Sequence, residues 1–260
     1  MKHGLYTIST LAAFMAIASS PAAAQNASSI WKDAVKKCAA SALQGGGTVF
    51  LGLSSNYAPG TVFARKARGR VQIQRRASEY ITDQDRAAVI NVNPPTSCAA
   101  VSQKSFRVGV TTDLTQLGVP ANIGIDVARA RSVSIQPTTV AWEDLVLGPY
   151  EDLVSNRAPA PIRQNLLVDH MPVLSRAVRV DGIKTVLKFD NSTGTTLSVK
   201  PIPLGIDAKW TSSTELTISS TATFYIAGQL SSFNDTSLQS TNRLVLKRDD
   251  ADTSLQTSAN

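Results

Sequence analysis

The chain has 260 residues, of which 43% are hydrophobic and 17% charged, and its formal net charge is +7. This balance is typical of a globular protein and excludes general disorder. Of the chain's two histidines, His3 lies in the leader described below, and its two cysteines are expected to bond to each other, which disfavours a standard structural zinc site. The chain also contains no cofactor-binding motif, so we expect neither a metal nor a cofactor.

Residues 1–24 have the pattern of a bacterial secretory signal peptide. Lys2 is followed by a short apolar run at 11–18, and alanines at 22–24 supply the small residues that signal peptidase accepts. The run is too short to span a bilayer, which needs about 20 residues. We expect cleavage before Gln25 and a periplasmic or secreted chain without a transmembrane segment; a buried N-terminal helix is the alternative. Loss of Lys2, the only basic residue of the leader, lowers the net charge from +7 to +6.

Residues 28–43 predict an amphipathic helix, because apolar side chains recur at near-helical spacing until a run of three glycines ends it. Cys38 lies on this helix, and Cys98 is the only other cysteine. Outside the cytoplasm two cysteines usually form one disulfide, and the C-x-x-C spacing of a redox pair is absent. We therefore expect a structural Cys38–Cys98 bond that ties the helix to the segment before residue 106.

Alternating or short apolar runs predict strands along most of the remaining chain. The expected strands are residues 48–53, 60–76, 106–112, 123–135, 140–147, 172–180, 183–189, 196–200, 214–219 and 221–227. Residues 150–154 predict a helical turn. The predicted fold class is therefore mostly β (all-β or α+β), with two β-rich modules and an N-terminal helix.

The division into modules depends on residues 155–164, which are polar, contain two prolines and predict a linker. We expect the N-terminal helix and the first β-module over residues 25–154 and the second β-module over 165–245. The polar residues 246–260 predict a flexible tail.

A weak internal repeat also favours two modules. Residues 123–127 (IGIDV) match residues 204–208 (LGIDA), and each copy follows a proline. Duplication of one β-module explains this match. Chance similarity between two strand–turn–strand units explains it nearly as well, so both interpretations stay open.

The strongest chemical feature is the basic run at residues 65–76. Read as one strand, its period of two places a polar row on one face. The row consists of Lys66, Arg68, Arg70, Gln72, Gln74 and Arg76. Its four cations, Lys66, Arg68, Arg70 and Arg76, are the predicted anion-binding residues.

The expected partner of this row is an anionic envelope component: a lipid headgroup, lipopolysaccharide or an acidic glycan. Aromatic residues do not interleave with the run, which disfavours nucleic acid because bases would have no stacking platform. The alternative is a solvated sheet face whose charge prevents edge-to-edge pairing.

Catalytic patterns are weak. His170, beside Asp169, is the only histidine after the leader, and residues 52–56 lack the closing glycine of a G-x-S-x-G elbow. Carboxylates are the other route to hydrolysis. The candidates are Glu143, Asp144, Glu151, Asp152, Asp126 and Asp207.

These observations favour an exported, non-enzymatic binding or envelope-associated protein that contacts an anionic surface or ligand through the basic strand. Two alternatives stay open. One is a periplasmic hydrolase that uses carboxylates or His170. The other is a subunit of an envelope or surface assembly, in which Thr/Ser-rich strands such as residues 214–227 complete the sheet of a partner protein.

Overall fold

The computed structural model describes residues 29–34, 37–38, 48–98, 102–105, 130–189, 206–233, 246–248 and 253–255. The predicted signal peptide, the predicted strands 106–112 and 196–200, Asp126 and the first copy of the repeat lie outside these residues. The fold is mostly β, as predicted, and is built on one large, mainly antiparallel sheet.

Twelve strands belong to this sheet in the described part of the chain. They are β1 (Thr48–Ser54), β2 (Val62–Arg65), β3 (Arg70–Arg75), β4 (Ile90–Val92), β5 (Thr96–Ser97), β6 (Ser102–Ser105), β7 (Ala130–Leu145), β8 (Val173–Phe189), β9 (Ile206–Ser212), β10 (Glu215–Phe233), β11 (Leu246–Arg248) and β12 (Thr253–Leu255).

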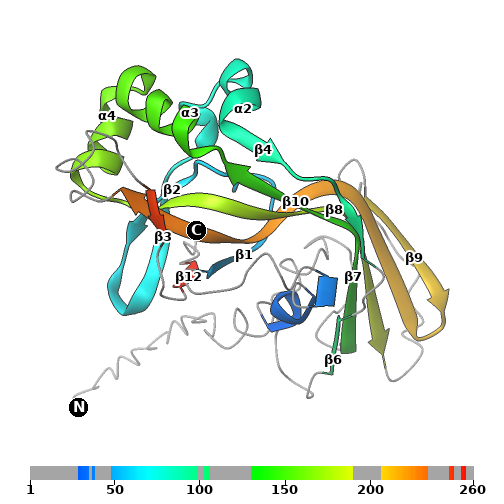
Figure 1. Ribbon diagram of the computed structural model, residues 1–260. Coiled ribbons are helices and arrows are strands. Elements are labelled where there is room, and N and C mark those ends of the chain that lie inside the picture. The colour runs from blue at the N-terminus through cyan, green and yellow to red at the C-terminus, as the bar shows by residue number, and fades with distance from the viewer. Residues whose placement is uncertain are drawn as a thin grey trace, which may run out of the picture.

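The helical elements beyond the N-terminal helix are short. They are α2 (Asp83–Val89), α3 (Leu147–Asp152) and α4 (Ala160–Arg163), the 3-10 helices η1 (Ala67–Gly69) and η2 (Ala77–Glu79), and the π-helices η5 (Leu153–Arg157) and η6 (Gln164–Val168). Helices α2, α3 and α4 gather at one end of the sheet (Figure 1).

The three long strands β7, β8 and β10 form the centre of the sheet. Strand β8 pairs with β7 from Phe189 to Arg176 and with β10 from Lys188 to Val173. The two strands expected at 172–180 and 183–189 are one strand, because Gly182 continues the chain at a φ of +76° while the register with β10 shifts beside it. The strands expected at 214–219 and 221–227 likewise join in β10.

Two expectations about loops differ from the structure. The segment 155–164, expected as a linker, lies largely in η5 and α4, and strands from both sides of it pair in one sheet. The division into two modules stays a prediction. The expected tail at 246–260 contains β11 and β12, which pair with β10, β1 and β3. Strands of three residues are too short to show an alternating pattern, so the sequence does not predict them. Pairing with neighbouring strands stabilises them more than their own composition does.

Six strands form a closed ring of pairings. Strand β8 pairs directly with β10, and the two are joined a second way through β1, β12, β3 and β2. A buried apolar cluster draws on five of these strands. It contains Val49, Leu51, Phe63, Val71, Leu174, Ala177, Tyr225 and Leu230.

The N-terminal helix confirms the prediction for its described residues, 29–34 and 37–38. Trp31 is fully buried against the apolar face of β7, β8 and β10, with Ile30 and Ala34 beside it. The predicted disulfide is also present: Cys38 and Cys98 are bonded, with a Cα–Cα distance of 5.5 Å. The bond therefore holds the helix onto the long strands.

Candidate functional site

The basic run folds as a hairpin and not as the single strand that its alternation predicts. Strands β2 and β3 pair antiparallel from Val62↔Arg75 to Arg65↔Val71. The amide of Lys66 donates to the carbonyl of Arg70 at 2.8 Å and closes the turn. Gly69, at a φ of +66°, is the only typical turn residue in the run. The sequence therefore predicts this turn only weakly.

The hairpin divides the four predicted anion-binding residues into two places. Lys66, Arg68 and Arg70 lie at the turn, and Arg76 follows the far end of β3. Six residues of extended chain separate Arg70 from Arg76, which corresponds to about 20 Å. The expected continuous row of cations is therefore wrong, because η1 interrupts the alternation after Lys66.

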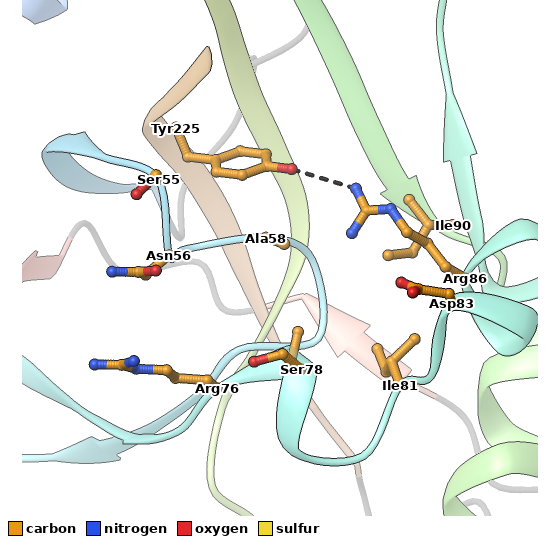
Figure 2. Close-up of a pocket in the computed structure, with 11 residues that line it drawn as sticks. Ser55, Asn56, Ala58, Arg76, Ser78, Ile81, Asp83, Arg86, Ile90 and Tyr225 are labelled. Atoms are coloured by element: carbon orange, nitrogen blue, oxygen red, sulfur yellow. Dashed lines mark hydrogen bonds between the residues drawn. The ribbon is translucent and has the colours of Figure 1, made fainter. Parts of the chain in front are cut away.

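Arg76 lies on the wall of a pocket with a volume of about 240 Å³. The loop after β1, η2, α2, the start of β4 and β10 together build it (Figure 2). The lining residues are Ser55, Asn56, Ala58, Arg76, Ala77, Ser78, Ile81, Asp83, Arg86, Ile90 and Tyr225.

One wall of this pocket is the loop after β1, and hydrogen bonds to the sheet and to η2 fix it. The Thr61 hydroxyl donates to the carbonyl of Ala58 at 2.8 Å. The phenol of Tyr80 donates to the carbonyl of Gly60 at 2.5 Å, and the Gly60 amide donates to Leu174 on β8. Gly60 has a φ of +95°, which other residues rarely adopt.

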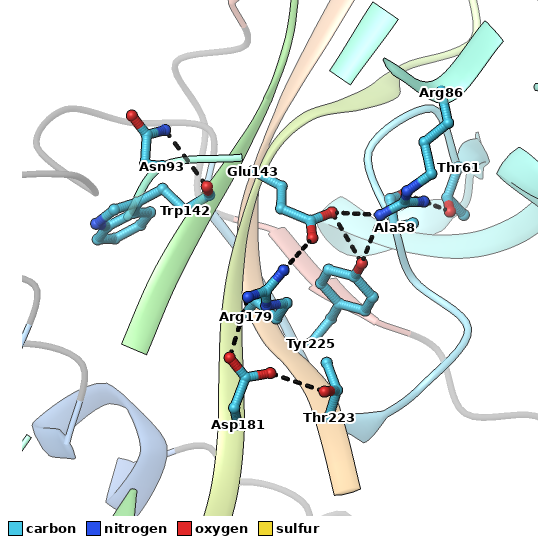
Figure 3. A network of polar contacts seen from close by, with 10 residues as sticks. All are labelled: Ala58, Thr61, Arg86, Asn93, Trp142, Glu143, Arg179, Asp181, Thr223 and Tyr225. Atoms are coloured by element: carbon cyan, nitrogen blue, oxygen red, sulfur yellow. Dashed lines mark hydrogen bonds and ion pairs between the residues drawn. The ribbon is translucent and has the colours of Figure 1, made fainter. Parts of the chain in front are cut away.

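Beneath the pocket lies a network of charged side chains centred on Glu143 (Figure 3). Glu143 is only 1% exposed, and each of its carboxylate oxygens faces a guanidinium: Arg86 Nη2 at 2.9 Å and Arg179 Nη1 at 2.9 Å. The phenol of Tyr225 donates a third bond to Glu143 at 2.8 Å. These partners come from α2, β8 and β10, so the network joins the helix to three neighbouring strands.

The same contacts set the protonation of two members of the network. Burial lowers the pKa of Arg86, but the bonds to Tyr225 and Glu143 outweigh it, and the net effect raises that pKa. Arg86 is therefore a permanent cation. Burial, together with the charge of Glu143, raises the pKa of Tyr225 to about 12, so this phenol stays protonated and keeps donating its hydrogen bond.

Further ion pairs extend the network along β7 and β8. Arg179 also contacts Asp181 at 3.0 Å, and the Thr223 hydroxyl donates to that carboxylate at 2.7 Å. Asp144 points to the other face of β7, where it contacts Arg176 and accepts from the Asn93 side chain. The predicted carboxylates Glu143 and Asp144 thus lie on opposite faces of β7, and each is ion-paired with arginine.

The remaining predicted catalytic candidates lie apart from the pocket. The ring of His170 has Nδ1 3.1 Å from the carbonyl of Phe233. Glu151 is buried in α3, Asp152 faces Arg157 at 3.7 Å, and Asp207 is exposed on β9. Across the described ranges, no group of three or more His, Cys, Asp or Glu is placed to hold a metal ion.

Both sides of the strand proposed for edge addition are occupied. Within residues 214–227, β10 pairs with β8 on one side and with β9 and β1 on the other. A partner strand at these residues would have to displace a neighbour.

None of the helices described is long and apolar enough to cross a membrane.

The sequence did not identify Arg86, Arg179 and Tyr225 as site residues. One usable indication existed: Glu143 lies between Ala141 and Leu145 on one face of an alternating strand, where a buried carboxylate requires a partner. Its partner Arg86 lies on α2, a seven-residue helix that the alternating pattern does not predict.

The comparisons with known proteins find likeness among solved structures, and it is distant. No protein-family model matches the chain, and no curated protein matches it. A solved structure, a bacterial gasdermin from Bradyrhizobium tropiciagri, is similar with a TM-score of 0.40 and 12% sequence identity, over 80% of this chain and 91% of that one. Likeness at this level bears on neither the ligand nor the activity of this chain.

Proposed function

We propose that this is an exported, non-enzymatic binding protein that attaches to the anionic lipid headgroups of a membrane surface through the turn of the β2–β3 hairpin. The observation that carries the proposal is the density of charge at this turn. Residues 65–76 contain six basic residues and no acidic residue. Three of them, Arg65, Lys66 and Arg70, are exposed.

The hairpin supports this role because it is anchored at its base and polar at its turn. Phe63 and Val71 are fully buried in the ring of strands, whereas every residue from Arg65 to Ala67 is exposed. Figure 1 shows the hairpin extending away from the helices α2, α3 and α4. Each lysine or arginine close to an anionic membrane contributes about 1 kcal/mol of attraction.

Co-sedimentation with lipid vesicles tests the proposal. The purified protein is mixed with vesicles of phosphatidylcholine alone or with added phosphatidylglycerol, at low and at physiological salt. We expect retention only on the anionic vesicles, with release as salt rises, because the Debye length falls from about 30 Å at 0.01 M to about 8 Å at 0.15 M.

Charge-matched variants locate the contact. K66Q/R68Q/R70Q removes three charges from the turn, and R163Q/K184Q/K209Q removes three charges from exposed positions on α4, β8 and β9. We expect the first variant to lose most of its vesicle binding and the second to keep it. Equal behaviour of the two variants, or binding to neither kind of vesicle, would overturn the proposal.

A further inference from the structure

The pocket beside Arg76 presents more hydrogen-bond donors than acceptors. Two guanidinium groups, three hydroxyls and one carboxamide line it, and Asp83 is its only carboxylate. An arginine offers N–H groups only, and a carboxylate accepts only. Such a lining suits a ligand that carries several acceptor oxygens and a negative charge.

Hydrogen bonds to Glu143 and Tyr225 fix the side chain of Arg86 at the pocket. Its Nη2 bonds to Glu143 at 2.9 Å and to the phenol of Tyr225 at 3.3 Å. No other hydrogen bond of this guanidinium occurs within the described chain, and its side chain is 41% exposed. The buried side of Arg86 is thus fixed, while Nε and Nη1 remain for a ligand. Prior ordering of an arginine reduces the entropy that binding loses.

Arg76 supplies the second guanidinium from a different element. It lies between β3 and η2 and is exposed, and no carboxylate of the described residues forms an ion pair with it. Its backbone is fixed, because its amide donates to the Glu79 carboxylate at 2.8 Å and its carbonyl accepts from the Glu79 amide at 3.1 Å. Figure 2 shows Arg76 and Asn56 at one end of the pocket and Arg86 at the other.

The apolar part of the lining is formed by Ala58, Ala77, Ile81 and Ile90. A bare inorganic anion would leave this patch uncovered, whereas an organic anion can place a short carbon chain on it. The volume of about 240 Å³ is below the 300 Å³ or so at which pockets for drug-sized ligands begin. The ligand is therefore small.

We infer that this pocket binds a small phosphate monoester, such as a glycerol or sugar phosphate. Its phosphate group, with several acceptor oxygens, would take bonds from a guanidinium and from the serine hydroxyls, and its carbon part would cover Ala58 and Ile81. The site is distinct from the hairpin turn and does not depend on the proposed function. The phosphate can belong to a free metabolite or to a lipid headgroup.

Isothermal titration calorimetry with glycerol 3-phosphate tests the inference, with inorganic phosphate as the smaller probe. R76Q should weaken binding of glycerol 3-phosphate about tenfold or more, the loss of a charge-assisted hydrogen bond. D83N should strengthen it about fivefold, because it removes the only carboxylate that lines the pocket. Both side chains are exposed, so we expect both variants to melt like the wild type.

Two control variants keep the outcomes separate. R163Q removes an exposed arginine of α4 outside the pocket and should leave phosphate binding unchanged. K66Q/R70Q should also leave it unchanged, even where vesicle binding is lost, so failure of the hairpin proposal and failure of the pocket proposal are distinguishable. Absence of binding to both phosphate probes, or binding that R76Q and D83N leave unaltered, would overturn the inference.

A lipid arm identifies the source of the phosphate. Vesicles of phosphatidylcholine with phosphatidic acid present the same monoester at a membrane. If R76Q weakens binding to these vesicles as well as to glycerol 3-phosphate, the ligand is a lipid headgroup. If only the soluble ester responds, the ligand is a free phosphate ester. Either result supports the phosphate site.

Discussion

Arg86 on α2 and Glu143 on β7 meet at 2.9 Å, although 57 residues of chain separate them. The contact is asymmetric, because the carboxylate is 1% exposed and the guanidinium 41%. Glu143 therefore needs its partners, whereas Arg86 retains a side that faces the pocket. The pair anchors α2 to the centre of the sheet and aims a cation at a potential ligand.

The first prediction concerns the charge of Glu143. E143Q keeps the shape of the side chain but leaves Arg86 and Arg179 facing a neutral amide. Breaking a buried ion pair from one side costs about 3–5 kcal/mol, so we expect the free energy of unfolding to fall by about that amount. Urea denaturation followed by circular dichroism measures the change.

The matched control for this prediction is E215Q. Glu215 faces Lys188 at 3.5 Å, and both side chains are substantially exposed. Exposed pairs contribute about 1 kcal/mol or less, so E215Q should unfold nearly like the wild type. If E143Q cost no more than E215Q, the network would not be what joins α2 to the sheet.

The second prediction follows from the raised pKa of Tyr225, about 12, against about 10 for an unfolded tyrosine. Between these values the folded protein keeps a proton that the unfolded chain has lost. The contribution of Tyr225 to stability is therefore complete below pH 10 and declines as the pH rises toward 12.

Y225F isolates this effect, because the other tyrosines titrate equally in both proteins. At pH 8 we expect the wild type to be more stable by about 1–3 kcal/mol, the cost of an unmade bond to a buried carboxylate. Urea titrations at pH 8, 10 and 11 should show that difference shrinking by about 1 kcal/mol at the highest pH. A difference that is constant with pH would contradict the prediction.

Much of the sheet could be predicted because period-two alternation is a local property. The helix around Trp31 agrees because helical spacing is local as well. The disulfide agrees because the chain has two cysteines and therefore one possible pair. The hairpin turn between Lys66 and Arg70 could not be found this way. Basic residues continue through the turn without proline or asparagine. The alternating patterns of β2 and β3 therefore look like the pattern of a single strand.

The candidate site was harder to predict, because long-range contacts create it. The sequence indicates Arg76 by its charge, but its separation from Lys66 follows from the hairpin. Glu143 stands in the sequence as one of two adjacent acids, which carry no geometric information in themselves. Its role depends on Arg86 and Tyr225, which are distant in sequence and have no shared motif.

The third prediction compares two glycines with positive φ. A Cβ added to Gly60, whose φ is +95°, would lie 2.4 Å from Ile81 Cδ1 and 3.3 Å from Ala77 Cβ. A Cβ added to Gly69, whose φ is +66°, would have no neighbour within 4 Å. G69A should cost about 1–2 kcal/mol, the backbone cost alone. G60A adds crowding at the pocket wall, so we expect a total of about 2–4 kcal/mol.

Thermal and urea unfolding of both variants measure this difference. Because Gly60 fixes the loop that lines the pocket, G60A should also weaken binding of glycerol 3-phosphate, whereas G69A should not. Equal destabilisation by the two substitutions would show that the space around Gly60 can adjust at no cost, and would contradict the prediction.

The fourth prediction concerns the disulfide between Cys38 and Cys98, which closes a loop of 60 residues. In the chain-entropy model such a bond stabilises a fold by about 4 kcal/mol. C38A/C98A should therefore unfold at a lower urea concentration but still fold, because Trp31, Ile30 and Ala34 keep the helix packed on β7 and β8. In W31A the disulfide remains while the largest apolar anchor is lost, at a cost of about 3–5 kcal/mol. If C38A/C98A were as stable as the wild type, packing of the helix alone would fix it to the sheet.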